Sequence, residues 1–330
     1  MSITLALAGD TMLGRGVAEK LERSGPDPLF ADEVVEAARS ADLFVLNLEC
    51  CISERGEPWP AREKPFFFRA PPMAVEALTK LGVDCVTLGN NHALDFGEVA
   101  LLDTFEHLTR AGIAWAGAGR DAERARAPAY LEVSGFRLAV LGVTDHPGDF
   151  AATHDHAGVA FADLRREVPE WLQDAIRTAR AEADAVLVTP HWGPNMAPEP
   201  VAHVRAAATA LREAGATLVA GHSAHVFHGV AGTVLFDLGD FVDDYIVDPV
   251  LRNDLGLLFF VTLDDAGLSR VEALPLKLDY CHTRVATGED AALIRRRFRD
   301  ACVALDTEVR EHERRLAVDL RGEEPGPGTC

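Results

Sequence analysis

Side chains suited to metal binding and proton transfer follow an apolar run near residue 88. The run Val83 to Leu88 has the pattern of a buried strand, and Asn90, Asn91 and His92 come directly after it, with Asp95 three residues further on. Sites in an open α/β sheet collect at the carboxyl ends of the strands. There an Asn side-chain oxygen is a neutral metal ligand, an imidazole is a proton donor, and a nearby carboxylate orients the ring. The alternative is a turn in which the two asparagines merely adopt unusual backbone angles. The residues at the other strand ends decide between a functional site and such a turn.

Four further apolar runs also end in side chains of the metal-ligand type. The polar residues at their ends are Asp10, Asn47 with Glu49, His191, and His222 with His225. Carboxylate, carboxamide oxygen and imidazole, without thiolate, favour Mn, Fe, Zn or Mg-like ions over copper(I) or an iron–sulfur cluster. A carboxylate shared by two ions about 3.5–4 Å apart is the usual arrangement for hydrolysis of phosphate or amide bonds. The pattern therefore predicts a site for one or two divalent metal ions.

The overall composition limits the classes of partner. The chain has 330 residues, of which 48% are hydrophobic, and this is enough for two domains or one large α/β domain. The formal net charge is −20, with 52 acidic against 32 basic residues. Because such a chain is repelled by phosphate backbones, we expect no nucleic-acid partner. The acidic bias suits a cation site.

The cysteines and the N-terminal residues indicate a reduced, cytoplasmic protein. The six cysteines show no CxxC spacing, and the adjacent Cys50 and Cys51 would point to opposite sides of an extended chain, which argues against a disulfide framework or a zinc ribbon. The first apolar run, Ile3 to Ala8, has no basic segment before it and is too short for a signal peptide or a membrane span. We therefore expect a cytoplasmic location without a membrane anchor.

Apolar runs alternate with amphipathic segments along most of the chain. Strands are expected at 3–8, 42–47, 66–68, 83–88, 114–116, 130–133, 138–143, 185–189, 217–220, 234–238, 257–263 and 271–276. Helices are expected at 17–21, 29–38, 73–81, 99–111, 169–183, 201–214 and 290–316. The Ser134-Gly135 turn indicates an antiparallel hairpin, so a mixed strand order is expected. We predict one α/β domain over residues 1–285, followed at 286–330 by a C-terminal helix and a frayed tail from residue 323.

Six short motifs, taken in order, resemble those of a known family. They are GDTMLGR at 9–15, NLE at 47–49, GNNHALDFG at 89–97, HWG at 191–193, GHSAHV at 221–226 and LGDF at 238–241. The pattern is similar to that of the CapA-type capsule (poly-γ-glutamate) synthesis proteins, which belong to the calcineurin-like metallophosphoesterase superfamily. The resemblance covers residues 3–241. It implies a four-layer α/β/β/α sandwich of two mixed sheets, with the metals at one edge.

The resemblance also implies two sets of metal ligands. Asp10 and His225 resemble first-metal ligands, and Glu49 stands where the superfamily has a bridging aspartate. The residues that resemble second-metal ligands are Asn91, His191 and His222. The superfamily usually has a histidine two residues after the first aspartate, and this chain has Met12 there, a poor ligand for hard ions. We therefore expect the first-metal site to be the weaker one, and a protein with one ion is the alternative to one with two.

The same resemblance assigns proton transfer to His92, with Asp95 orienting its ring. Asp240 either orients a ligand histidine or belongs to a simple acidic turn. Four basic residues have two possible roles: Arg15, Arg62, Lys64 and Arg69. They form a pocket for an anionic substrate, since guanidinium groups match carboxylate and phosphate, or they are merely solvated. Three histidines in the loop at 144–161 are expected to be loop or rim residues instead of ligands: His146, His154 and His156.

These observations predict a metal-dependent hydrolase that acts on a small anionic substrate, either a phosphoester or a γ-glutamyl-type amide. Hydroxide bound to one or two Mn, Fe or Zn ions would attack the substrate while His92 protonates the leaving group. One alternative is a non-hydrolytic, metal-containing component of poly-γ-glutamate capsule synthesis, and another is a degenerate binding module. Capsule relatives commonly carry Glu-Tyr after His-Trp-Gly and Asn in place of Asp240. This chain has Pro194-Asn195 and Asp240 there, and fold alone does not fix the substrate.

Overall fold

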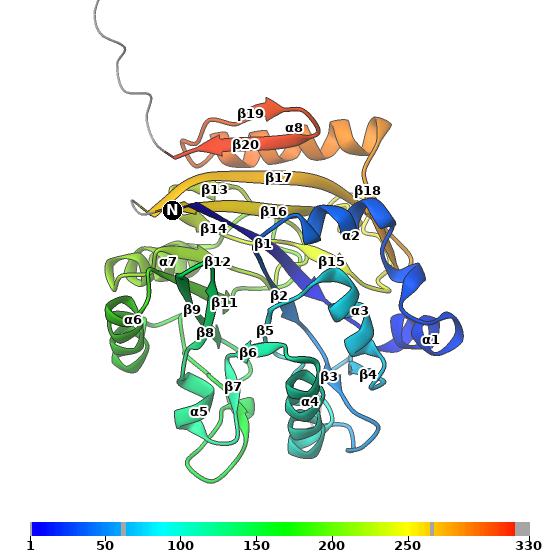
Figure 1. Ribbon diagram of the computed structural model, residues 1–330, viewed down its shortest axis with the longest axis vertical. Coiled ribbons are helices and arrows are strands. Elements are labelled where there is room, and N and C mark those ends of the chain that lie inside the picture. The colour runs from blue at the N-terminus through cyan, green and yellow to red at the C-terminus, as the bar shows by residue number, and fades with distance from the viewer. Residues whose placement is uncertain (1, 61–63, 265–266, 321–330) are drawn as a thin grey trace, which may run out of the picture.

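Two mixed β-sheets form the centre of the protein in the computed structural model, which describes residues 2–60, 64–264 and 267–320 (Figure 1). The parallel strands of the larger sheet are β1 (Ser2–Thr11), β2 (Leu43–Leu48), β5 (Cys85–Thr87), β6 (Ala114–Ala116) and β15 (Asp240–Val242), which pairs with the end of β1. Its antiparallel strands are β16 (Leu255–Asp264), β17 (Gly267–Asp279), β18 (His282–Val285), β19 (Arg310–His312) and β20 (Arg315–Asp319). The larger sheet is therefore mixed, with β2, β5 and β6 on one side of β1 and β15 and β16 on the other.

The smaller sheet has six strands and is also mixed. Their order is β13 (Val230–Ala231), β14 (Val234–Leu235), β12 (Leu218–Ala220), β11 (Ala185–His191), β9 (Phe136–Thr144) and β8 (Ala129–Val133). The middle four run parallel, and β8 and β9 form the predicted antiparallel hairpin. Its turn residues Ser134 and Gly135 both have positive φ, as tight hairpin turns require. Two further strand pairs are β3 (Cys51–Ile52) with β4 (Arg69–Ala70), and β7 (Ala118–Gly119) with β10 (Gly158–Val159).

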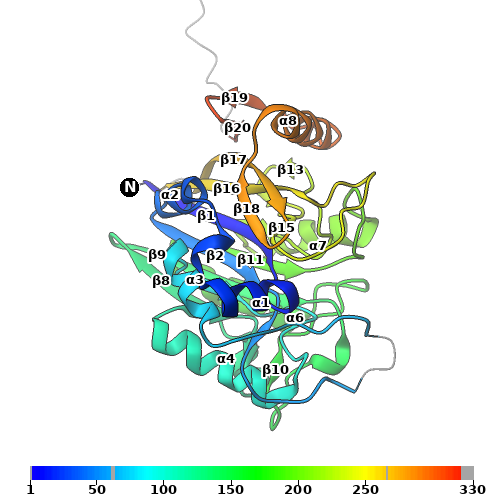
Figure 2. The ribbon, with the colours of Figure 1, turned by 90° about the vertical axis from the view of Figure 1, so that its right-hand side faces the viewer.

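Helices pack on the outer side of each sheet (Figures 1 and 2). Those on the larger sheet are α1 (Arg15–Ser24), α2 (Asp32–Arg39), α3 (Ala74–Leu81) and α4 (Gly97–Ala111), with the 3-10 turn η1 (Asp27–Leu29). Those on the smaller sheet are α5 (Ala122–Arg126), α6 (Glu170–Glu182) and α7 (Ala202–Glu213); η2 (Gly148–Phe150) lies in the loop after β9. Along β1, Leu5 and Leu7 face the cluster between the sheets, and Ala6 and Ala8 face the helices. The predicted α/β class with mixed sheets is confirmed.

A bulge near the end of β1 sets the direction of the first polar residue of the chain. The pairing of β1 with β2 shifts by one residue between Ala8 and Asp10, so that Asp10 lies opposite Asn47. A side chain at Gly9 would come within 1.9 Å of the Gly239 carbonyl oxygen, so the close approach of these two segments requires glycine. The bulge thus places Asp10 at the sheet edge, beside the ends of β2 and β15.

The C-terminal region differs from the prediction in its secondary structure. The helix expected at 290–316 is α8 (Gly288–Val303), which ends at Val303 and is followed by β19 and β20. Leu316 and Val318 are two residues apart, as one face of a strand requires, and both side chains are buried in the cluster between the sheets. β17 is therefore not the last strand of the sheet, and α8, β19 and β20 lie together at one end of the molecule (Figures 1 and 2). The predicted frayed tail lies outside the described residues, and the division at residue 285 stays a prediction.

The short strand expected at 66–68 is also wrong. The chain pairs instead at Arg69–Ala70, because the Phe68 amide donates to the Asp95 carboxylate and not to a neighbouring strand.

Among the described residues, no helix has both the length and the apolar character that crossing a bilayer demands. The five described cysteines are buried free thiols.

Candidate metal centre

The polar residues predicted as metal ligands gather at one edge of the fold. Asp10 is the last residue but one of β1, His191 is the last residue of β11, and the others follow the carboxyl ends of β2, β5 and β12. Parallel strands place these ends at the same edge of a sheet, and within the smaller sheet His191 and His222 form a bridge. The edges of both sheets meet here, since the Ser223 amide, which follows β12, donates to Asp10 of β1 at 3.1 Å. Asp10, Glu49 and His191 are fully buried.

Two groups of side chains are close enough to hold ions. The ligand atoms of Asp10, His191 and His222 lie within 4.8 Å of one another, and so do those of Asp10, Glu49 and His225. Asp10 belongs to both groups. Glu49 Oε1 is 3.7 Å from His191 Nε2, so Glu49 also lies between them. The structure thus brings five of the six predicted ligands together, namely Asp10, Glu49, His191, His222 and His225. The place of Asn91 among them and the assignment of each ligand to one ion stay predictions.

Several donor atoms at this edge are buried without a hydrogen-bond partner among the described residues. They are both carboxylate oxygens of Glu49, Oδ1 of Asn91, and Nε2 of His191 and of His222. Buried polar atoms without partners are rare and costly. Carboxylate, amide oxygen and imidazole are the donors that Mn, Fe and Zn accept. A divalent cation therefore fits these residues, because it would satisfy the unpaired atoms.

Burial makes the charge of Glu49 unfavourable in the absence of a cation, and it keeps the neighbouring histidines neutral. Burial, and then the neighbouring charge of Asp10, raise the pKa of Glu49 well above its usual value. Burial lowers the pKa of His222 to about 4, and burial together with His222 lowers the pKa of His191 well below its usual value. Neutral imidazole is the form that binds metals. The Nδ1 atoms of these two histidines lie 2.8 Å apart, so the two rings face each other at this edge.

His225 is tied to two carboxylates instead of being unpaired. Its Nδ1 lies 3.2 Å from Asp10 Oδ2 and 2.8 Å from Asp240 Oδ1, and its Nε2 is 3.2 Å from the Asn195 side chain. Burial alone would lower the pKa of His225, but Asp240 and Asp10 raise it well above its usual value. Of the two roles considered for Asp240, this contact agrees with orienting a histidine of the site and not with a simple acidic turn. Met12 is 1% exposed and packs in the cluster under the helices.

We expect Mn²⁺ to bind in two separate steps. The set with Asn91, His191 and His222 has unpaired donor atoms, whereas Asp10 and His225 already bond to each other, so an ion between them must replace existing hydrogen bonds. Calorimetric titration of the metal-free protein should therefore show a tighter event that weakens in Asn91→Ala and remains in His225→Ala. One event with two equally tight ions would contradict this order.

His92 lies beside this cluster in a fixed orientation. Its Nδ1 is 2.6 Å from Asp95 Oδ2, and its Nε2 points to the cluster at 3.8 Å from Glu49 Oε1. Lys64, whose side chain is 12% exposed, bonds to Asp95 Oδ1 at 2.9 Å and to the Asn91 carbonyl oxygen at 2.6 Å. Burial lowers the pKa of His92, although Asp95 opposes that shift. The predicted pairing of His92 with Asp95 is therefore present, and Lys64 holds the pair in place.

Arg15 lies one aromatic ring away from the centre. Its guanidinium carbon is 5.8 Å from the Tyr245 ring, whose centroid is 5.3 Å from that of His225. Its Nε donates to Asp244 at 3.1 Å, and its Nη1 is buried without a partner. Arg15 also has a positive φ of 52°, which is unusual for a side chain of this size. Its contact with substrate stays a prediction, and the unpaired nitrogen supports it.

Arg69 is engaged elsewhere. It donates to the carbonyl oxygens of Arg55 and Gly56 at 3.2 Å each, and its guanidinium group stacks 4.2 Å from the Phe96 ring. These contacts hold the loop after β3 in place. The predicted role of Arg69 in substrate binding stays untested, and Arg62 lies outside the described residues.

The three loop histidines separate into one beside the centre and two at the surface. The His146 ring lies 5.3 Å from that of His191, and its Nδ1 bonds to the buried Asp145 carboxylate. His154 and His156 are exposed, and His156 pairs with Glu98. His146 is therefore a rim residue, and the other two contact surface carboxylates.

Some residues of the centre carry no clear sequence signal. Asn47 was noted as a strand-end residue, yet its place beside Asp10, to whose Oδ1 it donates at 2.7 Å, follows from strand pairing. Tyr245 comes from the segment after β15, where only an acidic run draws attention. A tyrosine in a loop has no periodicity that would have identified it.

Ser223 and His225 have positive φ values of 114° and 59°, and such strain collects at functional sites.

Comparison with known proteins supports the resemblance noted in the sequence. The family model for the bacterial capsule synthesis protein PGA_cap matches residues 4–245. The chain is 30% identical over 343 residues to a probable polyglutamine synthesis accessory protein of Mycobacterium tuberculosis, covering 89% of both chains. It is 31% identical over 282 residues to the PGA biosynthesis protein CapA of Bacillus subtilis, covering 84% of this chain and 72% of that protein.

A solved structure supports the fold. The crystal structure of a novel phosphatase from Mycoplasma pneumoniae matches with a TM-score of 0.50 at 13% identity, covering 84% of this chain and 94% of that one. At this identity the likeness concerns the fold alone. Because the family model spans most of the chain and both relatives match along most of their length, the chain belongs to the family of bacterial capsule synthesis proteins described as PGA_cap.

Proposed function

We propose that this protein is a metal-dependent hydrolase of a small anionic substrate. The unpaired, buried donor atoms of Glu49, Asn91, His191 and His222 carry the proposal, since such a set is costly without a cation. The metal-holding residues would be these four with Asp10 and His225. A bound divalent ion supplies polarisation of the scissile group and activation of a water molecule. The residues fit Mn, Fe or Zn equally.

His92 is the proton donor of this proposal. Asp95 accepts the Nδ1 hydrogen, so the remaining nitrogen, Nε2, faces the side of Glu49 where the scissile bond would lie. Because burial lowers the pKa of the ring, the protonated form gives up its proton readily to a leaving group. The contact between the Phe68 and His92 rings, 4.5 Å between centroids, keeps water from one face of the imidazole.

The substrate would be anionic because an arginine close to the site keeps one nitrogen without a partner. Arg15 Nη1 has no partner and lies next to Tyr245, which contacts His225. A guanidinium group binds either a phosphate or a carboxylate. Both relatives are named for polyglutamine or PGA synthesis, which favours a γ-glutamyl-type amide over a phosphoester. The same names support a second candidate, a non-hydrolytic component of polymer synthesis.

Turnover assays on defined substrates test the proposal. Protein loaded with Mn²⁺, Fe²⁺ or Zn²⁺ is assayed against phosphoesters and γ-glutamyl amides, before and after chelation. We expect hydrolysis of one class, lost on chelation and restored by metal. Stoichiometric metal without hydrolysis of either class would instead favour the non-hydrolytic candidate.

We expect Lys64→Met to lower kcat roughly tenfold, corresponding to about 1.4 kcal/mol, with KM and metal content unchanged. Lys64 holds Asp95 and the Asn91 carbonyl oxygen, so its loss loosens the orientation of His92. Lys64→Arg should restore part of kcat, and Lys80→Met, which removes a surface pair with Asp27, should change nothing. A raised KM with unchanged kcat would mean that Lys64 binds substrate directly, as the sequence alone suggested.

A further inference from the structure

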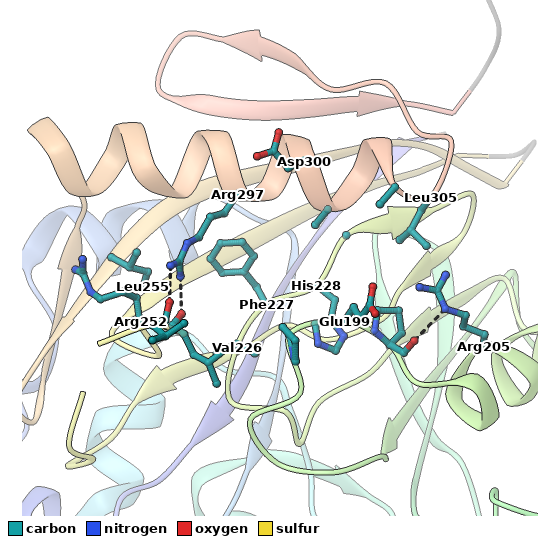
Figure 3. A pocket seen from close by; sticks show the side chains of 17 residues that line it. Glu199, Arg205, Val226, Phe227, His228, Arg252, Leu255, Arg297, Asp300 and Leu305 are labelled. Atoms are coloured by element: carbon teal, nitrogen blue, oxygen red, sulfur yellow. Dashed lines mark hydrogen bonds between the residues drawn. The ribbon is translucent and has the colours of Figure 1, made fainter. Parts of the chain in front are cut away.

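A pocket of about 400 Å³ lies beneath α8 (Figure 3). None of the six predicted metal ligands lines it. Its roof is one stripe of α8 that contains Arg297 and Ala301, which share a helix face because they are four residues apart, and Ala304 and Leu305 continue it just beyond the end of the helix. These four residues are called the α8 stripe. The opposite wall is the loop between β12 and β13. α8 lies beyond residues 4–245, so the part of the chain that matches the family model does not form this pocket by itself.

The size and lining of the pocket suit a small molecule with an apolar body. Ligand sites typically measure about 300–1,000 Å³ and are mostly apolar. The ring of Phe227 lies below α8, next to Arg297, and Leu255 and Leu305 close the two ends (Figure 3). Arg297 donates to the carbonyl oxygens of Val250 and Leu251, and these bonds hold α8 over the pocket.

Arg205 lines the pocket without an ion-pair partner among the described residues, although the carboxylates of Glu199 and Asp300 line it as well. Its Nε donates to the Pro200 carbonyl oxygen at 2.9 Å, and no carboxylate of the described residues pairs with its guanidinium group. Arg252, on the other side of the pocket, is by contrast paired with Asp254 and Asp290. In a chain with a net charge of −20, a guanidinium group left free in a pocket is suited to the carboxylate of a ligand.

His228 adds an unpaired hydrogen-bond acceptor on the same side. It is 5% exposed, and its Nε2 donates to the Ala197 carbonyl oxygen at 2.8 Å. The neutral ring then has its lone pair on Nδ1, which is buried without a partner. Burial, and also the charge of Arg205, lower the pKa of His228, so the ring is neutral. A buried acceptor of this kind normally finds a donor.

We infer that this pocket binds a small amphipathic carboxylic acid that carries an N–H donor, as an N-acyl amino acid does. The carboxylate lies at Arg205, the N–H donates to His228 Nδ1, and the apolar chain lies along Phe227 and the α8 stripe. Carboxylate and N–H are separated by one carbon in such a molecule, so one end of the ligand serves both residues. The inference does not depend on the proposed hydrolase activity.

N-octanoylglycine is the probe that tests it, by calorimetric titration in buffer with EDTA, so that the metal centre and any hydrolysis play no part. We expect one saturable site. Its methyl ester, which lacks the charge, and N-octanoylsarcosine, which lacks the N–H, should each bind at least about tenfold more weakly, a loss of roughly 1.4 kcal/mol. Equal affinity for the ester, or no binding of the acid up to about 1 mM, would overturn the inference. Equal affinity for the sarcosine would overturn the role of His228.

Variants locate the binding to this pocket. Ala301→Trp fills the space under α8 and should abolish binding, and Arg205→Met should weaken it at least tenfold while keeping the apolar stem. Arg212→Met is the matched control, because Arg212 lies on the same helix but does not line the pocket. Thermal melting shows whether each variant is folded. Undiminished binding in folded Arg205→Met would place the probe elsewhere and overturn the assignment.

Discussion

His92→Ala is expected to lose turnover by ~10²–10⁴-fold, the usual effect of removing a general acid, while it keeps its metal. The reason is geometric. His92 Nδ1 is committed to Asp95, and its Nε2 lies 3.8 Å from Glu49 on the side of the cluster, where it can reach a leaving group. The unpaired atoms that suit a metal belong to other residues. The variant therefore separates proton transfer from metal binding.

Elemental analysis and steady-state kinetics on the same preparations provide the measurement. His222→Ala is the comparison, because it should lose both metal and turnover, and His156→Ala is the control for a surface histidine. His92→Asn should not restore the rate, since an amide cannot deliver a proton. If His92→Ala lost as much metal as His222→Ala, His92 would be a ligand and another residue would supply the proton.

Glu49→Gln is expected to weaken metal binding and to stabilise the metal-free protein. Both oxygens of Glu49 are buried without partners, and burial and Asp10 raise its pKa well above the usual value. With metal, the carboxylate is the charge that the ions need. Without metal, its charged form is uncompensated in a buried site, so removing the charge should raise the free energy of unfolding by about 1–3 kcal/mol at a pH where Glu49 would otherwise ionise.

The stability of the metal-free protein should depend on pH through the Glu49 carboxyl group. An acid whose pKa is raised on folding stabilises the folded state below its unfolded pKa, and this contribution is lost as the pH rises through the folded pKa. The metal-free protein should therefore lose stability relative to Glu49→Gln as the pH is raised above about 4. Denaturant unfolding of both proteins in EDTA measures this, with Glu98→Gln as the exposed control. A variant less stable than the original at every pH would contradict the argument.

The sequence by itself determined the strands and the polar residues at their ends. The apolar runs that precede Asp10, Glu49 and His191 are local patterns, and burial of both faces of a central strand requires such runs. Because parallel strands align their carboxyl ends, the gathering of these residues at one edge also followed from the sequence. The hairpin at Ser134-Gly135 was predictable for the same local reason, since its turn residues tolerate positive φ.

The C-terminal region was mispredicted because two patterns compete there. The charged segment after Val303 is compatible with a helix, and pairing with β17 is what makes Leu316 and Val318 a strand. Strand pairing between distant segments depends on what lies beside them in the fold, which local propensity does not contain.

Contacts across the two sheets were decided by the tertiary structure alone. Ser223 reaches Asp10 from a position 213 residues later, and Lys64, expected to bind substrate, is placed against Asp95 by the irregular loop before β4. The pocket under α8 likewise joins Arg205 to Ala301. No periodicity relates such residues. Their proximity arises because the two sheets and α8 pack to bury apolar side chains, and the polar groups at the rim of that packing meet as its consequence.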